Sequence, residues 1–365
     1  MYDSDPVSYD VNISIGTCNN GMGAVNLAFY KVTNKPVVMK KFYLDNTEQE
    51  EYNLIEQEIV KMRHMQHPNI LPYLSAFIVE QSLCVVSPLM AYGSCSSLID
   101  EYFTEGLPEL VIAFVLRDVL QGLEYIHKRG LIHRAIKASH ILISILGQAC
   151  ISGLRYSCET TEHGKWQRNL FSFPKTIAPN LKWLSPELLK QDLHGYNEKS
   201  DIYSVGMTIC ELANGIVPFY DMPETLMLTE KVQGCAPHLI DRSSFPQDTD
   251  QIKQSNGNAS NNSLNVIDKR IESLSTKEFS EPFHSITEMC LQSDPGNRPS
   301  ATQLISHQFF KQCRKTDETL VDILKIVTPI HQRKIEYAGD RQMTISTEQV
   351  CNLNLETYQW DFENT

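Results

Sequence analysis

The glycine-rich stretch near the amino terminus and the lysine pair that follows it are the first residues in this chain able to do chemistry. Glycines at positions 16, 21 and 23 precede Lys40 and Lys41. The backbone N–H groups of a glycine loop can approach phosphate oxygens closely, and the two lysines offer positive charge. A lysine considered alone is more simply interpreted as a solvated surface charge. Phosphate binding therefore has to be judged on what the rest of the chain carries.

Cysteine chemistry is less promising, because the ten cysteines are scattered singly. They form no Cys-x-x-Cys pair and no Cys/His cluster at zinc spacing, so we interpret them as reduced thiols of a core. The amino-terminal residues MYDSDPVSYD lack the basic and then apolar run of a signal peptide. No run of about 18 apolar residues could span a bilayer. We therefore expect a soluble intracellular protein.

The composition of the 365 residues is that of a folded globular protein. Hydrophobic residues make up 42% and charged residues 21%, which excludes wholesale disorder, collagen-like and coiled-coil architectures. The formal net charge of -12 argues against a nucleic-acid-binding protein, which would show a basic face. At this length two lobes or domains are expected.

Two kinds of periodicity distinguish the elements that must position these residues. Residues 11–45 alternate apolar and polar positions around the glycines, which predicts three short antiparallel strands. Residues 48–65 carry apolar side chains at helical spacing, so one helix should lie on this small sheet. Two more strands are predicted within 71–80 and 82–90. The stretch 88–93 breaks the pattern as a linker between lobes would.

Beyond the linker the periodicity becomes helical. Helices are expected over 95–102, 109–129, 186–190, 200–214, 224–232, 280–292 and 300–312. The stretch 131–185 is loop-rich and apolar, whereas 241–275 is polar and rich in Asn and Ser, which indicates a mobile surface insertion. The tail loses its periodicity from about residue 325 until an aromatic cluster near the carboxyl end.

The order of the motifs resembles that of a eukaryotic protein kinase over residues 11–312. The motifs are the glycine loop, the strand lysine, a helical glutamate, His-Pro-Asn-Ile, His-Arg, Ser-Pro-Glu and Asp-Ile-Tyr-Ser-Val-Gly. The resemblance implies an α+β bilobal fold. A small lobe of antiparallel sheet with one long helix would occupy about 11–90, and a larger, mostly α-helical lobe about 93–312. Residues 1–10 would then be an extension and 313–365 a tail.

Five residues match the structural framework of that family. By resemblance, Lys40 is the strand lysine that binds the α and β phosphates, and Glu58 is its partner on the helix. Glu187 and Arg298 match the buried ion pair of the large lobe, and Asp201 matches the helix aspartate that bonds the backbone of the catalytic loop. The chain therefore keeps the residues that give the fold its shape.

The catalytic positions depart from the family pattern. The His-Arg-Asp motif reads His133-Arg134-Ala135, the asparagine that binds the second magnesium is His140, and the Asp-Phe-Gly motif begins with Gly153. An alanine methyl cannot accept the proton of a substrate hydroxyl, and imidazole is a poor ligand for a hard cation. Losing one preorganised electrostatic group costs about 10²–10³ in rate. We therefore predict a protein without phosphotransferase activity and without a bound metal.

Two interpretations of nucleotide binding stay open. The glycine loop is two residues longer than the family pattern, because it can be matched forward from Gly16 or backward from Val25, and Val38 replaces the small alanine that abuts the adenine. Against this, Lys40 and Arg155 could offset phosphate charge in place of a metal. The chain would then bind ATP without magnesium; the alternative is a collapsed, vestigial pocket. The candidate nucleotide-binding residues are Gly16, Cys18, Gly21, Gly23, Val25, Lys40, Glu58 and Arg155.

A closer resemblance narrows the family. The runs HRAIKASHILIS, ISGLR, WLSPELL and GYNEKSDIYSVGMTICELANGIVPFYDMP are similar to the Sterile-twenty-related kinase adaptors, with the beta form as the nearer match. The resemblance implies a pseudokinase that binds and allosterically activates a tumour-suppressor Ser/Thr kinase of the liver kinase B type. It implies a second partner, the armadillo-like scaffold protein called calcium-binding protein 39, and residence in both cytoplasm and nucleus.

Two segments would make these contacts. The segment 156–184 would be the activation loop, which in the resembling family lies on the partner kinase as a pseudosubstrate. Its candidate contact residues are Trp166, Arg168, Phe171 and Phe173. Such aromatic and basic side chains are enriched in interface hot spots, although they could instead pack on their own lobe. In the tail, Trp360, Asp361 and Phe362 match the scaffold-docking motif, the alternative being incidental aromatics.

We therefore expect an allosteric adaptor with no enzymatic activity of its own. One alternative is a weakly active kinase that uses displaced residues, and autophosphorylation with Mg²⁺ and Mn²⁺ would reveal it. The other is a nucleotide sensor, in which ATP binding gates the adaptor and partner affinity depends on ATP.

Overall fold

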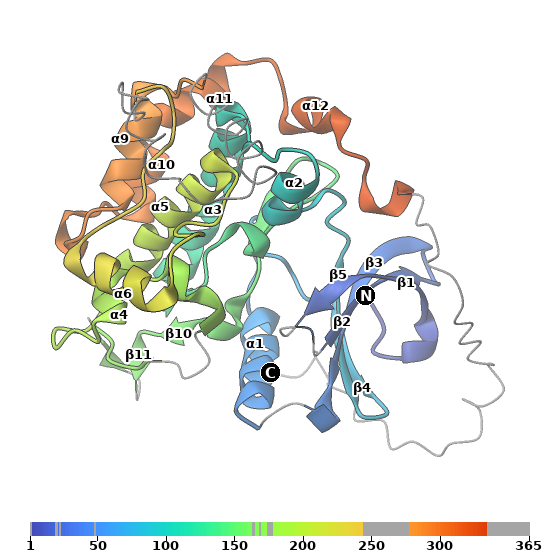
Figure 1. Ribbon diagram of the computed structural model, residues 1–365. Helices are drawn as coiled ribbons and strands as arrows, with labels where there is room; N and C mark the ends of the chain where they lie inside the picture. Colours follow the sequence, from blue (N-terminus) through green and yellow to red (C-terminus); the bar gives the residue numbers. More distant parts are fainter. Residues whose placement is uncertain are drawn as a thin grey trace, which may run out of the picture. The chain divides into compact units, whose positions relative to one another are not determined.

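The computed structural model describes residues 2–18, 21, 23–46, 49–162, 165–167, 169–173, 178–243 and 277–333. The chain divides into two compact units (Figure 1). The small unit comprises the residues up to 66, residues 71–92 and those from 328 onward. The large unit comprises residues 67–70 and 93–327.

A five-stranded antiparallel sheet forms the small unit, with strand order β1-β2-β3-β5-β4. Its strands are β1 (Tyr9–Cys18), β2 (Gly23–Tyr30), β3 (Lys35–Tyr43), β4 (Ser75–Val79) and β5 (Ser82–Pro88). Helix α1 (Gln49–Arg63) follows β3. The register pairs Lys40 with Val25 on one side and with Val85 on the other, so this lysine lies on the middle strand of the sheet.

Both faces of the small sheet are buried. Ile55 and Ile59 of α1 pack against Val85 on one face, whereas the neighbouring Val86 packs in a cluster with Tyr9 on the other. Successive side chains of a strand point to opposite faces. The alternating apolar residues of β5 therefore serve two separate cores.

The residues before the first strand belong to the packed part of the small unit. The ring of Tyr2 lies 4.8 Å from that of Tyr30, measured between centroids. The carbonyl oxygen of Asp3 accepts the hydroxyl groups of Tyr9, at 2.5 Å, and of Ser75, at 3.0 Å. The stretch that the resemblance treats as an amino-terminal extension thus lies on the sheet, and β1 already begins at Tyr9.

Two long helices, α3 (Glu109–Lys128) and α5 (Lys199–Asn214), form the centre of the large unit. Every residue of α5 after Lys199 is buried, which is the pattern of a helix surrounded by other elements. Helix α9 packs against α5, and α10 packs against α3. The other helices are α2 (Cys95–Glu101), α4 (Pro186–Leu189), α6 (Glu224–Gln233), α9 (Glu281–Cys290), α10 (Ala301–Ile305), α11 (Gln312–Lys315) and α12 (Leu320–Ile323).

Short strands hold the loops that carry the candidate site. The strand order β6-β8-β9 forms one small sheet, β7 pairs with β10, and β11 pairs with β12. Their bounds are β6 (Gly93–Ser94), β7 (Leu131–Ile132), β8 (Ile141–Ile143), β9 (Ala149–Ile151), β10 (Cys158–Glu159), β11 (Thr161–Glu162) and β12 (Lys165–Trp166). Residues 133–140 therefore connect β7 to β8, and residues 152–157 connect β9 to β10.

Most predicted elements are confirmed with end shifts of one to four residues. The main difference is the helix predicted over 300–312. Helix α10 ends at Ile305, and a short 3-10 helix follows at Gln308–Lys311. The side chain of His307 accepts the backbone N–H of Phe309, which satisfies a donor at a new helix start and so stabilises the break. In the described ranges, no helix is long and apolar enough to cross a membrane.

The described residues on either side of 244–276 are held close together. The backbone N–H of Arg242 donates to the carbonyl oxygen of Lys277 at 2.9 Å. The carboxylate of Asp241 accepts from Nε2 of His284 at 2.7 Å. Burial alone would raise the pKa of Asp241, but its hydrogen bonds lower it to about 2. The polar stretch that the sequence predicts as an insertion lies mostly outside the described residues, and it leaves and rejoins the large unit at adjacent points.

Candidate functional site

Asp201, near the start of α5, holds the backbone of the loop that follows β7. Its carboxylate oxygens accept the backbone N–H groups of His133 and Arg134, both at 2.8 Å, and Oδ2 also accepts from Nε2 of His127 at 2.8 Å. Burial alone would raise the pKa of Asp201, but the hydrogen bond from His127 and the charges of both histidines lower it. An ionised Asp201 thus fixes Arg134 at a φ of 62°, which non-glycine residues rarely adopt.

The ring of His133 is buried in the same loop and ties it to the end of β9. Its Nδ1 accepts the backbone N–H of Ala135 at 3.2 Å, so the proton is on Nε2, which donates to the carbonyl oxygen of Ser152 at 3.1 Å. Burial lowers the pKa of His133 to about 4, although the Asp201 carboxylate opposes that shift. The ring is therefore neutral at physiological pH and acts as a structural bridge.

Ala135 stands where the family has its catalytic carboxylate. The residue is buried, with 1% of its surface exposed, and its methyl group can neither donate nor accept a proton. Its carbonyl oxygen accepts the Nδ1–H of His140 at 2.7 Å. The imidazole of His140 is thereby turned back onto the backbone of the catalytic loop.

Gly153, at the position of the family's metal-binding aspartate, lies against the same imidazole. A Cβ atom at Gly153 would lie 2.7 Å from Nδ1 of His140 and 2.9 Å from two of its ring carbons. Real Cβ atoms do not approach other atoms so closely. The backbone of Gly153 also has a φ of 88°, where side chains are strained. The His140 ring therefore fills the space that a metal-binding side chain at 153 would need.

These three positions do not fit the magnesium ions that protein kinases use. Magnesium prefers oxygen ligands in octahedral geometry. Here the three positions present a methyl group, an imidazole whose Nδ1 is already hydrogen-bonded, and no side chain. Within the part of the chain that the structure describes, no group of three or more His, Cys, Asp and Glu side chains could hold a metal ion.

The cationic residue that follows Gly153 lies over an aromatic ring. The guanidinium of Arg155 is 5.0 Å from the ring centroid of Tyr156 and donates to its hydroxyl at 3.1 Å. The Tyr156 ring is in turn stacked on His140, with centroids 6.5 Å apart. Stacked and hydrogen-bonded in this way, Arg155 is a positive charge with a defined position.

A second buried charge, which the sequence analysis did not single out, lies below the catalytic loop. Nζ of Lys137 donates to the carbonyl oxygen of Pro179 at 3.1 Å and lies 5.2 Å from the ring centroid of Trp183. The Trp183 indole N–H donates to Glu211 at 2.8 Å. Burial lowers the pKa of Lys137 to about 8 and raises that of Glu211 to about 7. The position of Lys137 two residues after Ala135 could have indicated this contact.

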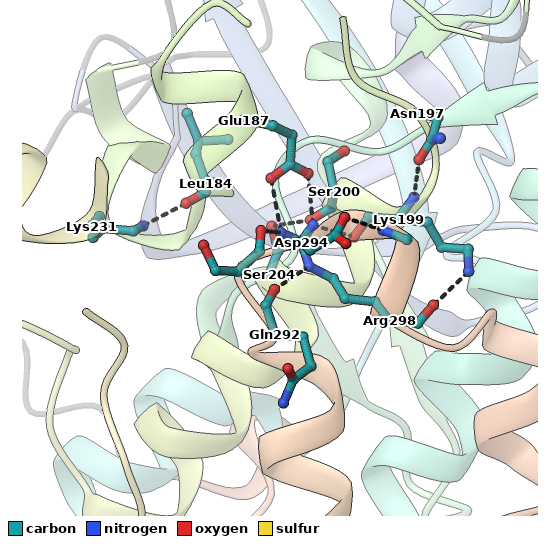
Figure 2. Close-up of polar contacts among 12 residues, drawn as sticks. Leu184, Glu187, Asn197, Lys199, Ser200, Ser204, Lys231, Gln292, Asp294 and Arg298 are labelled. Carbon is teal, nitrogen blue, oxygen red and sulfur yellow. Dashed lines mark hydrogen bonds and ion pairs between the residues drawn. The ribbon is translucent and has the colours of Figure 1, made fainter. Parts of the chain in front are cut away.

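The ion pair between Glu187 and Arg298 is the best-satisfied charged contact in the large unit (Figure 2). The two carboxylate oxygens of Glu187 accept from Nη1 and Nη2 of Arg298 at 2.6 and 2.8 Å. The other guanidinium N–H groups donate to the carbonyl oxygens of Gln292, Lys199 and Ser293. A fully bonded arginine ties the end of the activation segment to the loop after α9.

Lys231 is a further buried cation near this pair, on helix α6 (Figure 2). Its ammonium donates to the carbonyl oxygens of Leu184, at 2.5 Å, and Lys182, at 2.9 Å. Burial lowers its pKa to about 7, although Glu187 opposes the shift. Sequence analysis missed this residue. The available signal was its place four residues after Met227, on the buried side of the helix.

In the small unit, the candidate glycines have different surroundings. A Cβ atom at Gly16 or Gly21 would meet nothing within 4 Å, whereas one at Gly23 would lie 2.6 Å from Sγ of Cys18 and 2.8 Å from the carbonyl oxygen of Lys41. Gly23 is thus needed for close packing of the hairpin itself. Residues 19, 20 and 22, at the tip, lie outside the described residues.

Lys40 and Glu58, the candidate lysine and its helical partner, both lie in the small unit. Glu58 is buried, with 5% of its surface exposed, on the inner side of α1. Lys40 is half-buried on β3. Among the residues that the structure describes here, no ion pair joins the two. The lysine–glutamate pair of active kinases is therefore not formed.

The predicted partner-contact residues are only partly described. Phe171 has 69% of its surface exposed and Phe173 has 37%, so Phe171 does not pack into the core of its own unit. Trp166 ends strand β12, but its side chain is outside what the structure describes, as is Arg168 altogether. The predicted scaffold-docking residues 360–362 also lie outside the described ranges.

Comparison with known proteins agrees with this geometry. The protein kinase domain family matches residues 9–310. STE20-related kinase adapter protein alpha of Homo sapiens is 41% identical over 365 residues, covering 97% of this chain and 84% of the relative. The alpha protein of Bos taurus is 40% identical, with 97% of both chains covered. STE20-related kinase adapter protein beta of Mus musculus is 41% identical over 340 residues, covering 90% and 81%.

The alpha and beta relatives match at nearly the same identity, so assignment to the beta form stays a prediction. The match extends through nearly the whole chain, beyond the kinase domain itself. The fold of the two units and the retained framework residues fit the same family. The chain thus carries a protein kinase domain and belongs to the STE20-related kinase adaptor family.

Proposed function

We propose that this protein is a catalytically inactive pseudokinase that acts as an adaptor for another kinase. The observation that carries the proposal is the arrangement of Ala135, His140 and Gly153. A methyl group replaces the base, and an imidazole occupies the space where a side chain at 153 would bind metal. The adaptor role comes from the name that its relatives bear, STE20-related kinase adapter protein.

The loss of rate follows from the groups that these positions lack. Removing one preorganised electrostatic group costs about 10²–10³ in rate. The losses do not multiply fully when groups act as a unit, but here the base and both metal ligands are replaced. In contrast, Asp201, Glu187 and Arg298 keep their hydrogen bonds. The chain has retained the framework of the large unit while its catalytic groups are absent.

The proposed partner is a tumour-suppressor Ser/Thr kinase of the liver kinase B type, which the adaptor activates allosterically. Binding energy alone can do this. If the free partner is active-like in a few per cent of molecules, an adaptor that prefers the active form by about 3 kcal/mol shifts most of the population. Support for the docking segment is the exposure of Phe171 and Phe173, because an exposed aromatic side chain is the residue type that anchors interfaces.

Two further parts of the proposal rest on the sequence. Trp360, Asp361 and Phe362 would dock on an armadillo-like scaffold of the calcium-binding protein 39 type. ATP would bind without magnesium, since the metal positions offer no oxygen ligand while Arg155 supplies positive charge. Residence in both cytoplasm and nucleus is part of the same proposal, by analogy with the family.

Reconstitution from three purified proteins tests the proposal. The partner kinase's turnover of a peptide substrate should rise when this chain and the scaffold are added together. Trp360→Ala with Phe362→Ala should lower scaffold affinity at least tenfold, because hot-spot truncations cost about 2 kcal/mol or more. A nucleotide sensor would require ATP for partner binding, whereas the adaptor binds without it. Partner turnover unchanged by the complete set would refute the adaptor role.

A further inference from the structure

The guanidinium of Arg134 is buried and its bonds lead to the activation segment. With 6% of the residue exposed, Nε donates to the carbonyl oxygen of Tyr156 at 2.7 Å and Nη1 donates to the hydroxyl of Tyr196 at 3.0 Å. Both acceptors are uncharged oxygens of this chain. Arg134 therefore joins the start of the activation segment to the loop that precedes α5.

Tyr196 passes this connection on to residues 170–172. Its hydroxyl donates to the carbonyl oxygen of Ser172 at 2.6 Å. Its backbone pairs with Leu170 in both directions, at 2.7 and 2.9 Å. Its ring packs in a cluster with Leu170 and Leu184. The exposed Phe171 thus lies between two residues that Tyr196 holds.

The neighbouring Gly195 allows the two segments to approach. It has a φ of 72°, and a Cβ atom there would lie 2.6 Å from the carbonyl oxygen of Leu170 and 3.1 Å from the ring of Phe171. A side chain at this position would therefore push residues 170–171 away. Backbone conformation, backbone pairing and the tyrosine hydroxyl all favour one path for these residues.

In regulated kinases, an activation loop is commonly ordered when a phosphorylated residue pairs with arginine. We propose that Tyr196 replaces the phosphate here and acts as a latch, holding residues 170–172 through Arg134 so that Phe171 is presented without any phosphorylation. The hydroxyl accepts from the charged guanidinium and donates to Ser172, so it serves both sides at once. A hydrogen bond to a charged group changes an equilibrium by about 10- to 100-fold.

Only the consequence for partner binding rests on the proposed function, because the latch itself is a property of the isolated chain. Tyr196→Phe removes the hydroxyl and keeps the ring. Tyr203→Phe is the matched control, since the Tyr203 hydroxyl is buried and has no hydrogen-bond partner among the described residues. Hydrogen exchange followed by mass spectrometry on peptides covering 169–173 measures the effect.

We expect Tyr196→Phe to speed exchange in these peptides about tenfold or more, while Tyr203→Phe changes it less than twofold. Equal exchange in both variants would overturn the latch. Because a variant can lose its fold, peptides from α5 serve as the internal reference. A second measurement needs no variant: phosphatase treatment of the wild-type chain, verified by intact mass, should leave protection of 169–173 unchanged, and loss of protection would also overturn the latch.

Partner binding separates this inference from the proposed function. If the partner kinase binds the wild-type chain, Tyr196→Phe should weaken that binding at least fivefold without moving the melting temperature by more than a few degrees. If binding is unchanged although exchange has accelerated, Tyr196 does not position the docking residues and that part of the inference is wrong. If the wild-type chain does not bind the partner at all, the proposed function fails, whereas the exchange result still decides the latch.

Discussion

Restoring an aspartate at position 153 should destabilise the large unit, because the His140 ring occupies the space that the new side chain needs. The strain has two sources. The backbone of Gly153 has a φ of 88°, and a left-handed conformation costs a non-glycine residue about 1–2 kcal/mol. The Cβ atom would also lie 2.7–2.9 Å from three ring atoms, and such overpacking typically costs about 1–3 kcal/mol. Gly153→Asp should therefore lower the free energy of unfolding by about 2–5 kcal/mol.

Removing the ring should recover part of that loss. His140→Ala alone forfeits the hydrogen bond to the Ala135 carbonyl oxygen, 2.7 Å long, at a cost of about 1 kcal/mol. In the double variant only the backbone strain and this lost bond remain, so the two changes should together cost about 1–3 kcal/mol less than their sum. Urea unfolding followed by circular dichroism measures all four corners of the cycle.

Gly21→Asp provides the control for backbone strain. Gly21 has a φ of 89°, almost the same as Gly153, but an added Cβ atom would meet nothing within 4 Å. We expect this variant to lose no more than about 1–2 kcal/mol. Additive costs for His140→Ala and Gly153→Asp, or equal costs for the two aspartate variants, would refute the reasoning that the imidazole fills the metal position.

Three further predictions follow from the buried groups and the chain ends. Glu187→Gln leaves a buried guanidinium without its charge partner, so urea unfolding should show a loss of about 3–5 kcal/mol; a loss below 1 kcal/mol would contradict the buried pair. The pKa of His133 is lowered to about 4, so the unfolded chain binds a proton there first as the pH falls. Stability should drop by on the order of 3 kcal/mol between pH 6.5 and 4, and His133→Gln should flatten that dependence; an equal slope in both proteins would exclude His133 as its source. Replacing 244–276 by a short Gly-Ser linker should leave the melting temperature within about 2 °C, because Arg242 and Lys277 already join the ends; a larger fall would mean that the replaced residues stabilise the large unit.

The elements were predictable where one periodicity extends over many residues. Helix α3 carries apolar side chains on its buried positions over 20 residues, and the sequence placed its ends within one residue. The helix predicted over 300–312 failed because a local cap at His307 interrupts it. A cap of that kind depends on one side chain meeting one backbone N–H, which periodicity does not report.

The candidate site was predictable in its chemistry and not in its geometry. The motif positions alone indicate that Ala135, His140 and Gly153 have lost the groups needed for phosphoryl transfer. That the His140 ring would occupy the space of the missing aspartate depends on the φ of Gly153 and on a ring orientation fixed by a hydrogen bond. Neither quantity can be read from residue types.

The buried cations were missed for a related reason. Lysine is usually exposed, and the ammonium of Lys231 is stabilised in the interior only because two carbonyl oxygens converge on it. Those oxygens belong to residues 182 and 184, almost 50 positions earlier in the chain. Such contacts between distant segments are a property of the tertiary structure.

The most direct test of the central claim, that this chain acts without catalysis, is a measurement of its own phosphate transfer. The purified protein is incubated with radiolabelled ATP and generic substrates in the presence of Mg²⁺ or Mn²⁺, next to the same protein carrying Lys40→Ala. The absence of base and metal ligands predicts that both give the same background incorporation. Incorporation above background by the wild-type chain that disappears in the Lys40→Ala variant would contradict the claim.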